Sequence, residues 1–251
     1  MEHTGAVADA VVAVVATMQE RLDALTPAQE PLREFLGTYQ RTTWAVGRAV
    51  DDGMFEDPVW VEAWDVAFAQ LYLSALDAHL AGGTPSRPWR LAFDAPADLP
   101  ALRQVLLGIN AHVNYDLPQA LLAVISDDDF AEASVLGRRQ RDHERIDGVL
   151  AGRVAAEDAE LSSKGRTLLD RVLQPLNRLS SKRFLREARQ KVWHNTVELQ
   201  AARLAGPTTY DERLAELEVL SAARIADLLA PGQVLLRLAV AGFGVVLPPA
   251  R

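Results

Sequence analysis

The chain lacks cysteine altogether, and it lacks any surplus of positive charge. None of its 251 residues is Cys, and 34 acidic residues outnumber 26 Lys and Arg, for a formal net charge of −8. Without thiols, disulfide bonds, thiolate metal ligands and cysteine nucleophiles are excluded. A nucleic-acid backbone requires a basic footprint on its protein. We therefore expect no nucleic-acid partner.

Long hydrophobic runs are missing too. The most apolar stretch, residues 234–247, is too short to cross a bilayer and contains Arg237. We expect the apolar C-terminal segment, 233–251, to pack on the core or on a second copy of the chain, which makes a homodimer a candidate assembly. The N-terminal residues lack the basic region of a signal peptide. These features predict a cytoplasmic protein without a membrane span.

Alternating strand patterns of convincing length are absent, whereas helical periodicity covers most of the chain. The sequence predicts an all-α fold: residues 1–251 form a single domain, a bundle of about seven to nine helices around a buried central helix. The longest predicted loop, 82–98, is a candidate lid or rim. A second break is predicted at 152–165.

The predicted central helix spans about 99–125, with a kink at Pro118. At about 100° per residue, its apolar positions share one narrow stripe, namely Leu102, Leu106, Ile109, Val113, Leu117, Ala120 and Val124. Both flanks of the stripe are apolar as well. A helix that is apolar nearly all round is usually central to its domain.

Four polar residues interrupt this segment: Asn110, His112, Asn114 and Asp116. Burying them is unfavourable unless each finds a partner. The imidazole and the carboxylate lie four residues apart, so one helical turn brings both to a shared metal ion, water or substrate. Two interpretations follow: a functional pocket, or a satisfied network that fixes helix register without chemistry.

Further candidates lie outside this segment. Helical projection places Asp142, His143 and Arg139 toward the apolar stripe of the helix predicted near 130–151, and Asp65 on a broad apolar face of an earlier helix. The spacing of His112 and Asp116 recurs in His143 and Asp147, and again in His194 and Glu198. The last pair projects away from its stripe, which favours a surface ion pair but leaves its part in the site open.

Three motifs resemble an actinobacterial family that is catalogued only as a domain of unknown function. They are G-I-N-A-H-V-N-Y-D-L-P at 108–118 (a GINAHxNxDLP signature), D-H-E-R-I-D at 142–147 and F-x-D-x-x-W-V at 55–61. The resemblance implies a helical fold and a site near the first motif, but no activity. A more local similarity links His112-x-x-x-Asp116, followed by Leu-Pro, to the H-x-x-x-D helix of zinc-dependent phospholipase C and single-strand nucleases. That similarity implies a buried metal cluster.

The first functional hypothesis is a helical enzyme, a hydrolase or lyase that depends on one or two divalent metal ions such as zinc. The expected metal ligands are His112, Asp116, Asp142, His143 and Asp65. The remaining candidate residues would act on a small-molecule substrate: Asn110 and Asn114 orient it, and Arg139 stabilises developing negative charge.

The alternative needs no metal. In it, the helices enclose a pocket for a largely apolar small molecule, as in a carrier or a biosynthetic cyclase or isomerase. His112 and Asp116 then form an acid–base pair, or they anchor the polar end of the ligand. A third hypothesis is a scaffold that dimerises through its C-terminal segment.

Overall fold

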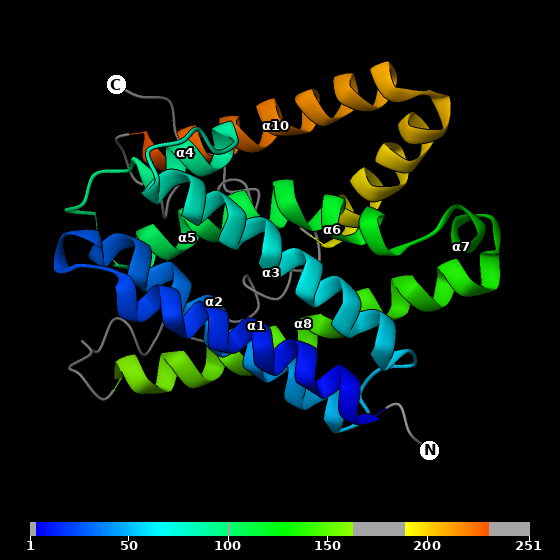
Figure 1. Ribbon diagram of the computed structural model, residues 1–251, viewed down its shortest axis with the longest axis horizontal. Coiled ribbons are helices and arrows are strands. Elements are labelled where there is room, and N and C mark those ends of the chain that lie inside the picture. The colour runs from blue at the N-terminus through cyan, green and yellow to red at the C-terminus, as the bar shows by residue number, and fades with distance from the viewer. Residues whose placement is uncertain (1–3, 100, 163–188, 231–251) are drawn as a thin grey trace, which may run out of the picture.

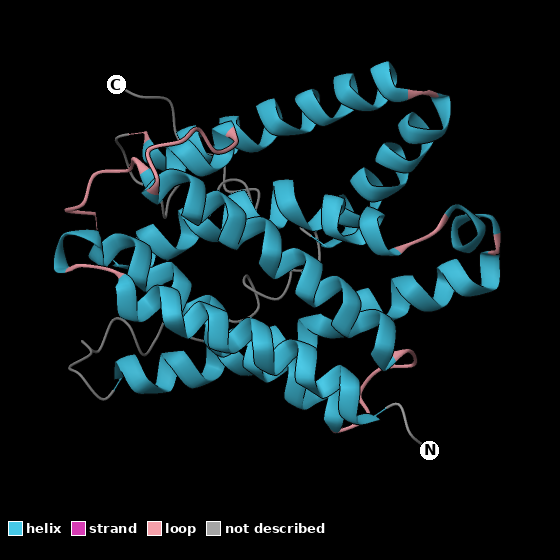
Figure 2. Ribbon diagram, in the orientation of Figure 1, coloured by secondary structure: helices cyan, strands magenta, loops and turns pink. Residues whose placement is uncertain are grey.

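The structure is a computed structural model, and it describes residues 4–99, 101–162 and 189–230. Every regular element in these ranges is helical (Figure 2), which confirms the predicted all-α fold. The long elements are α1 (Thr4–Ala24), α2 (Glu30–Asp51), α3 (Pro58–Leu80), α5 (Ala101–Ala111), α6 (Leu117–Val124), α8 (Ala133–Ser162) and α10 (Pro207–Leu229). Shorter turns are η1 (Pro27–Gln29), α4 (Arg87–Phe93), η2 (His112–Asp116) and α7 (Asp127–Ala131), and a further helix covers 189–205.

The helix α3 crosses the middle of the molecule and organises its neighbours (Figure 1). It contacts α1 and α2 along one side and α6 on another. Its start is fixed locally: the Asp57 carboxylate accepts a hydrogen bond from the Trp60 N–H, and Pro58 occupies the first helical position. Proline suits that position because the first N–H groups of a helix have no partner within the helix.

The predicted central helix is interrupted. Residues 101–124 form α5, the wider turn η2 and then α6, rather than one helix with a kink. Within α5 the buried face is displaced from the predicted stripe: Leu107 and Ala111 are fully buried, whereas Leu106 and Ile109 are only half-buried. In α6, the stripe positions Leu117 and Ala120 are buried as predicted. The displacement follows from the neighbours, because α5 is covered by α2 on one side and by α4 and α10 on another.

Both predicted loops are partly helical. The segment 82–98 contains α4, which packs against α10. The break predicted at 152–165 is wrong over its described part, because α8 continues to Ser162. The C-terminal segment 233–251 lies outside the described residues.

One hydrophobic cluster connects the helices from Val14 in α1 to Leu228 in α10. Trp64, Tyr72, Trp89 and Leu117 are among its fully buried members. A single domain over residues 1–251 remains a prediction. None of the described helices is both long and apolar enough to cross a membrane.

Candidate functional site

A π-helical turn, η2, lies within the motif at residues 108–118. In η2, the N–H of Leu117 donates to the carbonyl of His112, five residues earlier. Pro118 follows at once, near the start of α6. Because proline has no N–H and its ring clashes with the carbonyl four residues back, a regular α-helix cannot run through this position. The wider turn absorbs the conflict, and such π-turns frequently occur at functional sites.

The turn brings His112 and Asp116 together as a hydrogen-bonded dyad. The Nδ1 atom of His112 lies 2.9 Å from Oδ2 of Asp116, and the indole Nε1 of Trp89 donates to the same oxygen at 2.8 Å. The two residues are 2% and 3% exposed. We assign the proton of the imidazole to Nδ1, since this tautomer donates to the carboxylate. The other ring nitrogen, Nε2, then carries a free lone pair.

Aromatic rings enclose the imidazole. Phe68 stacks on it, with ring centroids 3.5 Å apart and planes within 4°. The ring of Tyr39 lies edge-on to the imidazole, with ring centroids 4.5 Å apart. The cage is completed by Phe35, Tyr72 and Trp89. These rings come from α2, α3 and α4. Together they remove water from both faces of His112.

This environment sets the protonation of the dyad. Burial lowers the pKa of His112, against the hydrogen bond and the charge of Asp116, and so keeps the imidazole neutral. Burial raises the pKa of Asp116, while the hydrogen bonds from His112 and Trp89 act against that rise. The Nε2 atom of His112 is fully buried and has no hydrogen-bond partner. An orphaned buried acceptor typically costs about 1–3 kcal/mol, so it calls for an explanation.

A shallow surface depression, with a cavity volume of only about 10 Å³, borders the cage. It is lined by Pro31, Leu32, Phe35, Tyr72, Trp89, Ala92, Phe93, Gln104 and Gly108. Three of these rings also touch His112. A side chain at Gly108 would not fit, because its Cβ would lie 2.4 Å from the Phe35 ring. Trp89, Ala92 and Phe93, which line the depression, all belong to α4. The role of the segment 82–98 as a lid or rim remains a prediction.

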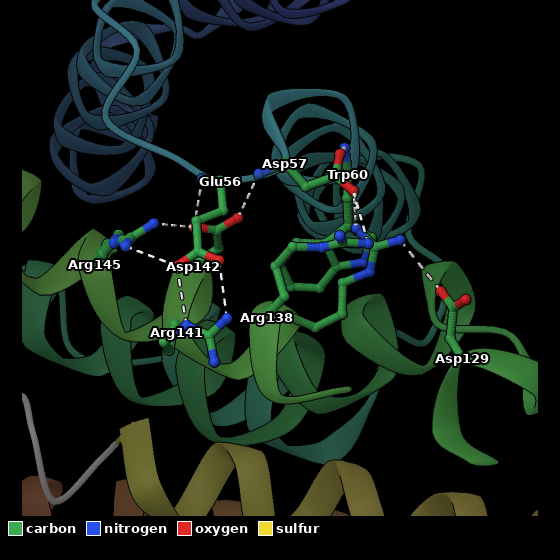
Figure 3. Close-up of polar contacts among 9 residues, drawn as sticks. Glu56, Asp57, Trp60, Asp129, Arg138, Arg141, Asp142 and Arg145 are labelled. Atoms are coloured by element: carbon green, nitrogen blue, oxygen red, sulfur yellow. Dashed lines mark hydrogen bonds and ion pairs between the residues drawn. The ribbon is translucent and has the colours of Figure 1, made fainter. Parts of the chain in front are cut away.

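Asp142 is placed elsewhere, at the junction of α8 and the start of α3 (Figure 3). Its Oδ1 accepts from the N–H of Glu56 and from Arg145, each at 2.9 Å, and its Oδ2 accepts from the N–H of Asp57 at 2.8 Å. The side chain is fully buried, and both oxygens are used. Asp142 thus ties α8 to α3 and has no contact with the dyad.

Arg139 belongs to the same junction. It pairs with Asp57 and with Asp129, and its guanidinium lies 5.1 Å from the ring centroid of Trp60. These contacts occupy the cation in a structural ion network. The structure does not bring it near His112.

His143 is buried against the helix over 189–205. Its ring lies near Trp64 and Trp193. Both ring nitrogens are 3.5 Å from atoms of Arg189, the carbonyl oxygen and the guanidinium. Arg189 also forms an ion pair with Asp147. Burial, together with the charge of Arg189, lowers the pKa of His143.

Asp65 lies in the interior, on α3. Burial, and next the neighbouring charge of Glu62, raises its pKa to about 8, against the attraction of Arg189. One of its carboxyl oxygens, Oδ2, is buried without a hydrogen-bond partner. Within the described residues Asp65 forms no hydrogen bond with His112. The ring of Tyr39 packs against His112, and the charge of Asp65 raises the pKa of Tyr39 after the larger effect of burial.

The remaining candidates do not converge on the dyad. Asn114 donates to Asn110, and Asn110 donates to the carbonyl of Leu106, so the asparagines pair locally along the helix. His194 and Glu198 are exposed, as their projection predicted. Substrate orientation by the asparagines remains a prediction.

The donor set does not fit a divalent cation. Within the described ranges, no three His, Asp or Glu side chains converge as metal ligands. The oxygens of Asp142 are already used, and the Arg189 cation lies beside His143. Asp116 already accepts two hydrogen bonds. The metal-dependent hypothesis remains a prediction that this geometry does not support.

Sequence reasoning missed the cage as a site. Phe35, Tyr39, Phe68 and Tyr72 occupy regular core positions of α2 and α3, where aromatic residues are ordinary. The available signal is the two tyrosines, because a buried hydroxyl on an apolar stripe needs a partner.

The chain belongs to a family of unknown function (DUF5995), whose model matches residues 11–231. The match covers the dyad, the cage and the junction between α3 and α8. No curated protein and no solved structure matches the chain. The function must therefore be argued from the site itself.

Proposed function

We propose that this protein binds an uncharged, mainly apolar small molecule and that His112 acts on it as a general base, as in a metal-free isomerase or cyclase. The proposal rests on one observation: the Nε2 atom of His112 is buried and unpartnered while Nδ1 is held by Asp116. A group on the ligand that presents a proton to Nε2 would satisfy that atom.

The surroundings of the dyad favour a neutral ligand. Among the described residues, the charge that acts on His112 is that of Asp116, and no Lys or Arg contacts either residue. The depression is lined by apolar and aromatic side chains, with Gln104 as the polar exception. A phosphate or carboxylate would be desolvated there without a cation to pair with, which is strongly unfavourable.

The chemistry follows from the geometry of the dyad. Nε2 removes a proton from an acidic C–H or O–H group of the ligand, and the imidazole becomes a cation. Asp116 stabilises that cation through Nδ1, while Trp89 holds the carboxylate in place. The aromatic cage excludes water, so the charge interaction between the imidazolium and Asp116 is strong. Phe35, Tyr72 and Trp89 line the depression and also pack against His112, so the depression is the proposed route of the ligand to Nε2.

A nitrobenzisoxazole tests the proposal without knowledge of the natural substrate. This neutral, apolar probe loses its ring C–H proton to a base, its N–O bond breaks, and a coloured cyanophenolate forms. We expect the wild-type protein to accelerate this elimination and His112→Gln to slow it about 100-fold. The rate should be unchanged after exhaustive chelation.

The matched control is His194→Gln, which removes an exposed histidine from the helix over 189–205. It should retain the wild-type rate. Equal rates for the wild-type protein and His112→Gln would overturn the proposal. A rate that is lost on chelation and restored by zinc would favour the metal-dependent hypothesis instead.

We also propose that the run 108–118 is the signature of the family, because it contains Gly108, the π-turn and the dyad. An alignment of family members should show glycine, histidine and aspartate at positions 108, 112 and 116. The actinobacterial origin, the cytoplasmic location and the homodimer remain predictions.

A further inference from the structure

Tyr72 carries a buried hydroxyl group that the dyad of His112 and Asp116 does not use. The residue is fully buried, and its hydroxyl has no hydrogen-bond partner. Buried polar atoms are almost always satisfied, so this exception calls for an explanation. Burial, and next the charge of Asp77, raises the pKa of Tyr72. The hydroxyl therefore keeps its proton and is available as a hydrogen-bond donor.

The position of Tyr72 relative to His112 is fixed by packing. Tyr72 follows Phe68, the ring that stacks on the imidazole, by one turn of α3. The centroid of its own ring lies 5.8 Å from that of the imidazole. Phe35 and Trp89 pack against it as well, each with ring centroids 5.0 Å away. The donor is thus preorganised beside the base, as the stabilisation of a developing charge requires.

The unpartnered atoms of Tyr72 and His112 are complementary. The hydroxyl of Tyr72 donates a hydrogen bond, whereas Nε2 of His112 has a free lone pair. The two atoms are not bonded to each other, so both are available to one group from outside. Tyr72 also lines the depression. Tyr39 has a buried, unpartnered hydroxyl too, but it is not among the lining residues. A ligand at the depression therefore meets the hydroxyl of Tyr72.

We propose that the ligand is an apolar ketone and that Tyr72 donates a hydrogen bond to its carbonyl oxygen. This inference rests on the proposed function. A ketone combines a hydrogen-bond acceptor with an acidic C–H group on the next carbon, so one group on the ligand satisfies both unpartnered atoms. A ketone is also neutral, and it enters an apolar site at a lower desolvation cost than an ion.

The reaction that follows is a proton shift next to the carbonyl group. Nε2 of His112 removes the proton, the electron pair of the C–H bond forms a C=C bond, and the carbonyl oxygen becomes an enolate oxygen. Tyr72 stabilises that oxygen through its hydroxyl. In a β,γ-unsaturated ketone, the imidazolium then returns the proton to the γ carbon, and a conjugated ketone results. The proton that leaves the ligand also returns to it, so no co-reactant is required.

Infrared spectroscopy of bound cyclohexanone tests the hydrogen bond without any reaction. The probe has an isotope-labelled carbonyl group, and the full chain is in excess. The C=O stretch of the bound probe should lie at a lower frequency in the wild-type protein than in Tyr72→Phe, because the hydrogen bond weakens the C=O bond. Tyr39→Phe, the matched control in the same cage, should retain the wild-type frequency. Equal frequencies in the wild-type protein and Tyr72→Phe, or no bound probe, would overturn the assignment of the donor.

The isomerisation of a β,γ-unsaturated cyclohexenone provides the second readout, because its conjugated product absorbs ultraviolet light. Tyr72→Phe should slow this reaction about 100-fold, the loss that follows removal of one donor to an oxyanion. The nitrobenzisoxazole elimination should slow far less, since its phenolate product spreads the charge over the ring and the nitro group. Tyr210→Phe, in the separate hydrophobic cluster with Leu217, should leave both rates unchanged.

The two reactions separate this inference from the proposed function. Equal isomerisation rates in the wild-type protein and Tyr72→Phe would overturn the ketone. If His112→Gln still slows the elimination in that case, the proposed function stands. Equal losses of both reactions in Tyr72→Phe would show that the hydroxyl supports the shape of the site rather than a carbonyl group, and would overturn the inference as well.

Discussion

The chain contains two buried histidines with an aspartate four residues later, and their environments differ. His112 bonds to Asp116 inside an aromatic cage, and one of its ring nitrogens is unpartnered. His143 and Asp147 have Arg189 between them, which contacts both. The same spacing therefore produces a poised base in one place and a structural ion network in the other. The spacing of histidine and aspartate identifies candidate pairs. The residue that contacts the pair, Trp89 in one case and Arg189 in the other, distinguishes their roles.

The largest effect of a single substitution on stability is expected at the junction between α8 and the start of α3. Asp142→Ala should lower the free energy of unfolding by about 3–5 kcal/mol, because Arg145 and two buried backbone N–H groups lose their acceptor. Urea denaturation measures this change. Glu144→Ala, at an exposed position of the same helix, should alter it by less than about 0.5 kcal/mol. An Asp142 variant as stable as the wild-type protein would show that the junction is not structural.

At the dyad of His112 and Asp116, a substitution should mainly change the rate of the elimination reaction. Asp116→Asn should slow the elimination about 100-fold, since the amide cannot stabilise the imidazolium. Asp142→Asn, at the other region, should leave the rate within about twofold. If the two variants slowed the reaction equally, the functional distinction between the regions would be lost.

Two glycines within helices differ in the space around them: Gly108 is tightly packed and Gly148 is not. Gly108→Ala should destabilise the protein by about 1–3 kcal/mol, because its Cβ would meet the Phe35 ring at 2.4 Å. Gly148→Ala in α8 meets nothing within 4 Å and should stabilise by up to about 1 kcal/mol. Thermal unfolding of both variants checks the pair. Opposite signs support the close approach of Phe35 to the dyad's helix.

The pH dependence of stability should reveal Asp65. Its pKa is raised from 3.8 to about 8, so between these values the folded protein holds a proton that the unfolded chain has released. The contribution of Asp65 to stability should then fall as pH rises from 4 to 8, by up to about 1.4 kcal/mol per pH unit.

Asp65→Asn should flatten that slope. The lowered pKa values of His112 and His143 act in the opposite sense, because stability falls as pH drops below their ordinary value of 6.5. That acid limb should persist in Asp65→Asn. Urea denaturation across this pH range measures both limbs, and a variant with the wild-type slope would contradict the assignment to Asp65.

Local periodicity in the sequence was enough to predict the fold class and the burial or exposure of several residues. An all-α fold follows from helical patterning, and the burial of His112 and Asp116 from four polar residues within an apolar segment. The exposure of His194 and Glu198 follows from their projection.

Long-range partners were not predictable in this way. Asp142 projects inward like a site residue, but its partners Glu56 and Asp57 lie about 85 residues earlier in the chain. The cage draws its rings from α2, α3 and α4, whose relative placement no local pattern encodes. The π-turn arises where Pro118 conflicts with helix continuation, and a kink was the simpler expectation.

The most direct test of the central claim is the tautomer and titration of His112, measured from the nitrogen shifts of histidine-labelled protein. We expect a neutral imidazole at neutral pH, with the proton on Nδ1 and none on Nε2. A proton on Nε2, or a His112 that titrates at the ordinary pKa of an exposed histidine, would contradict it.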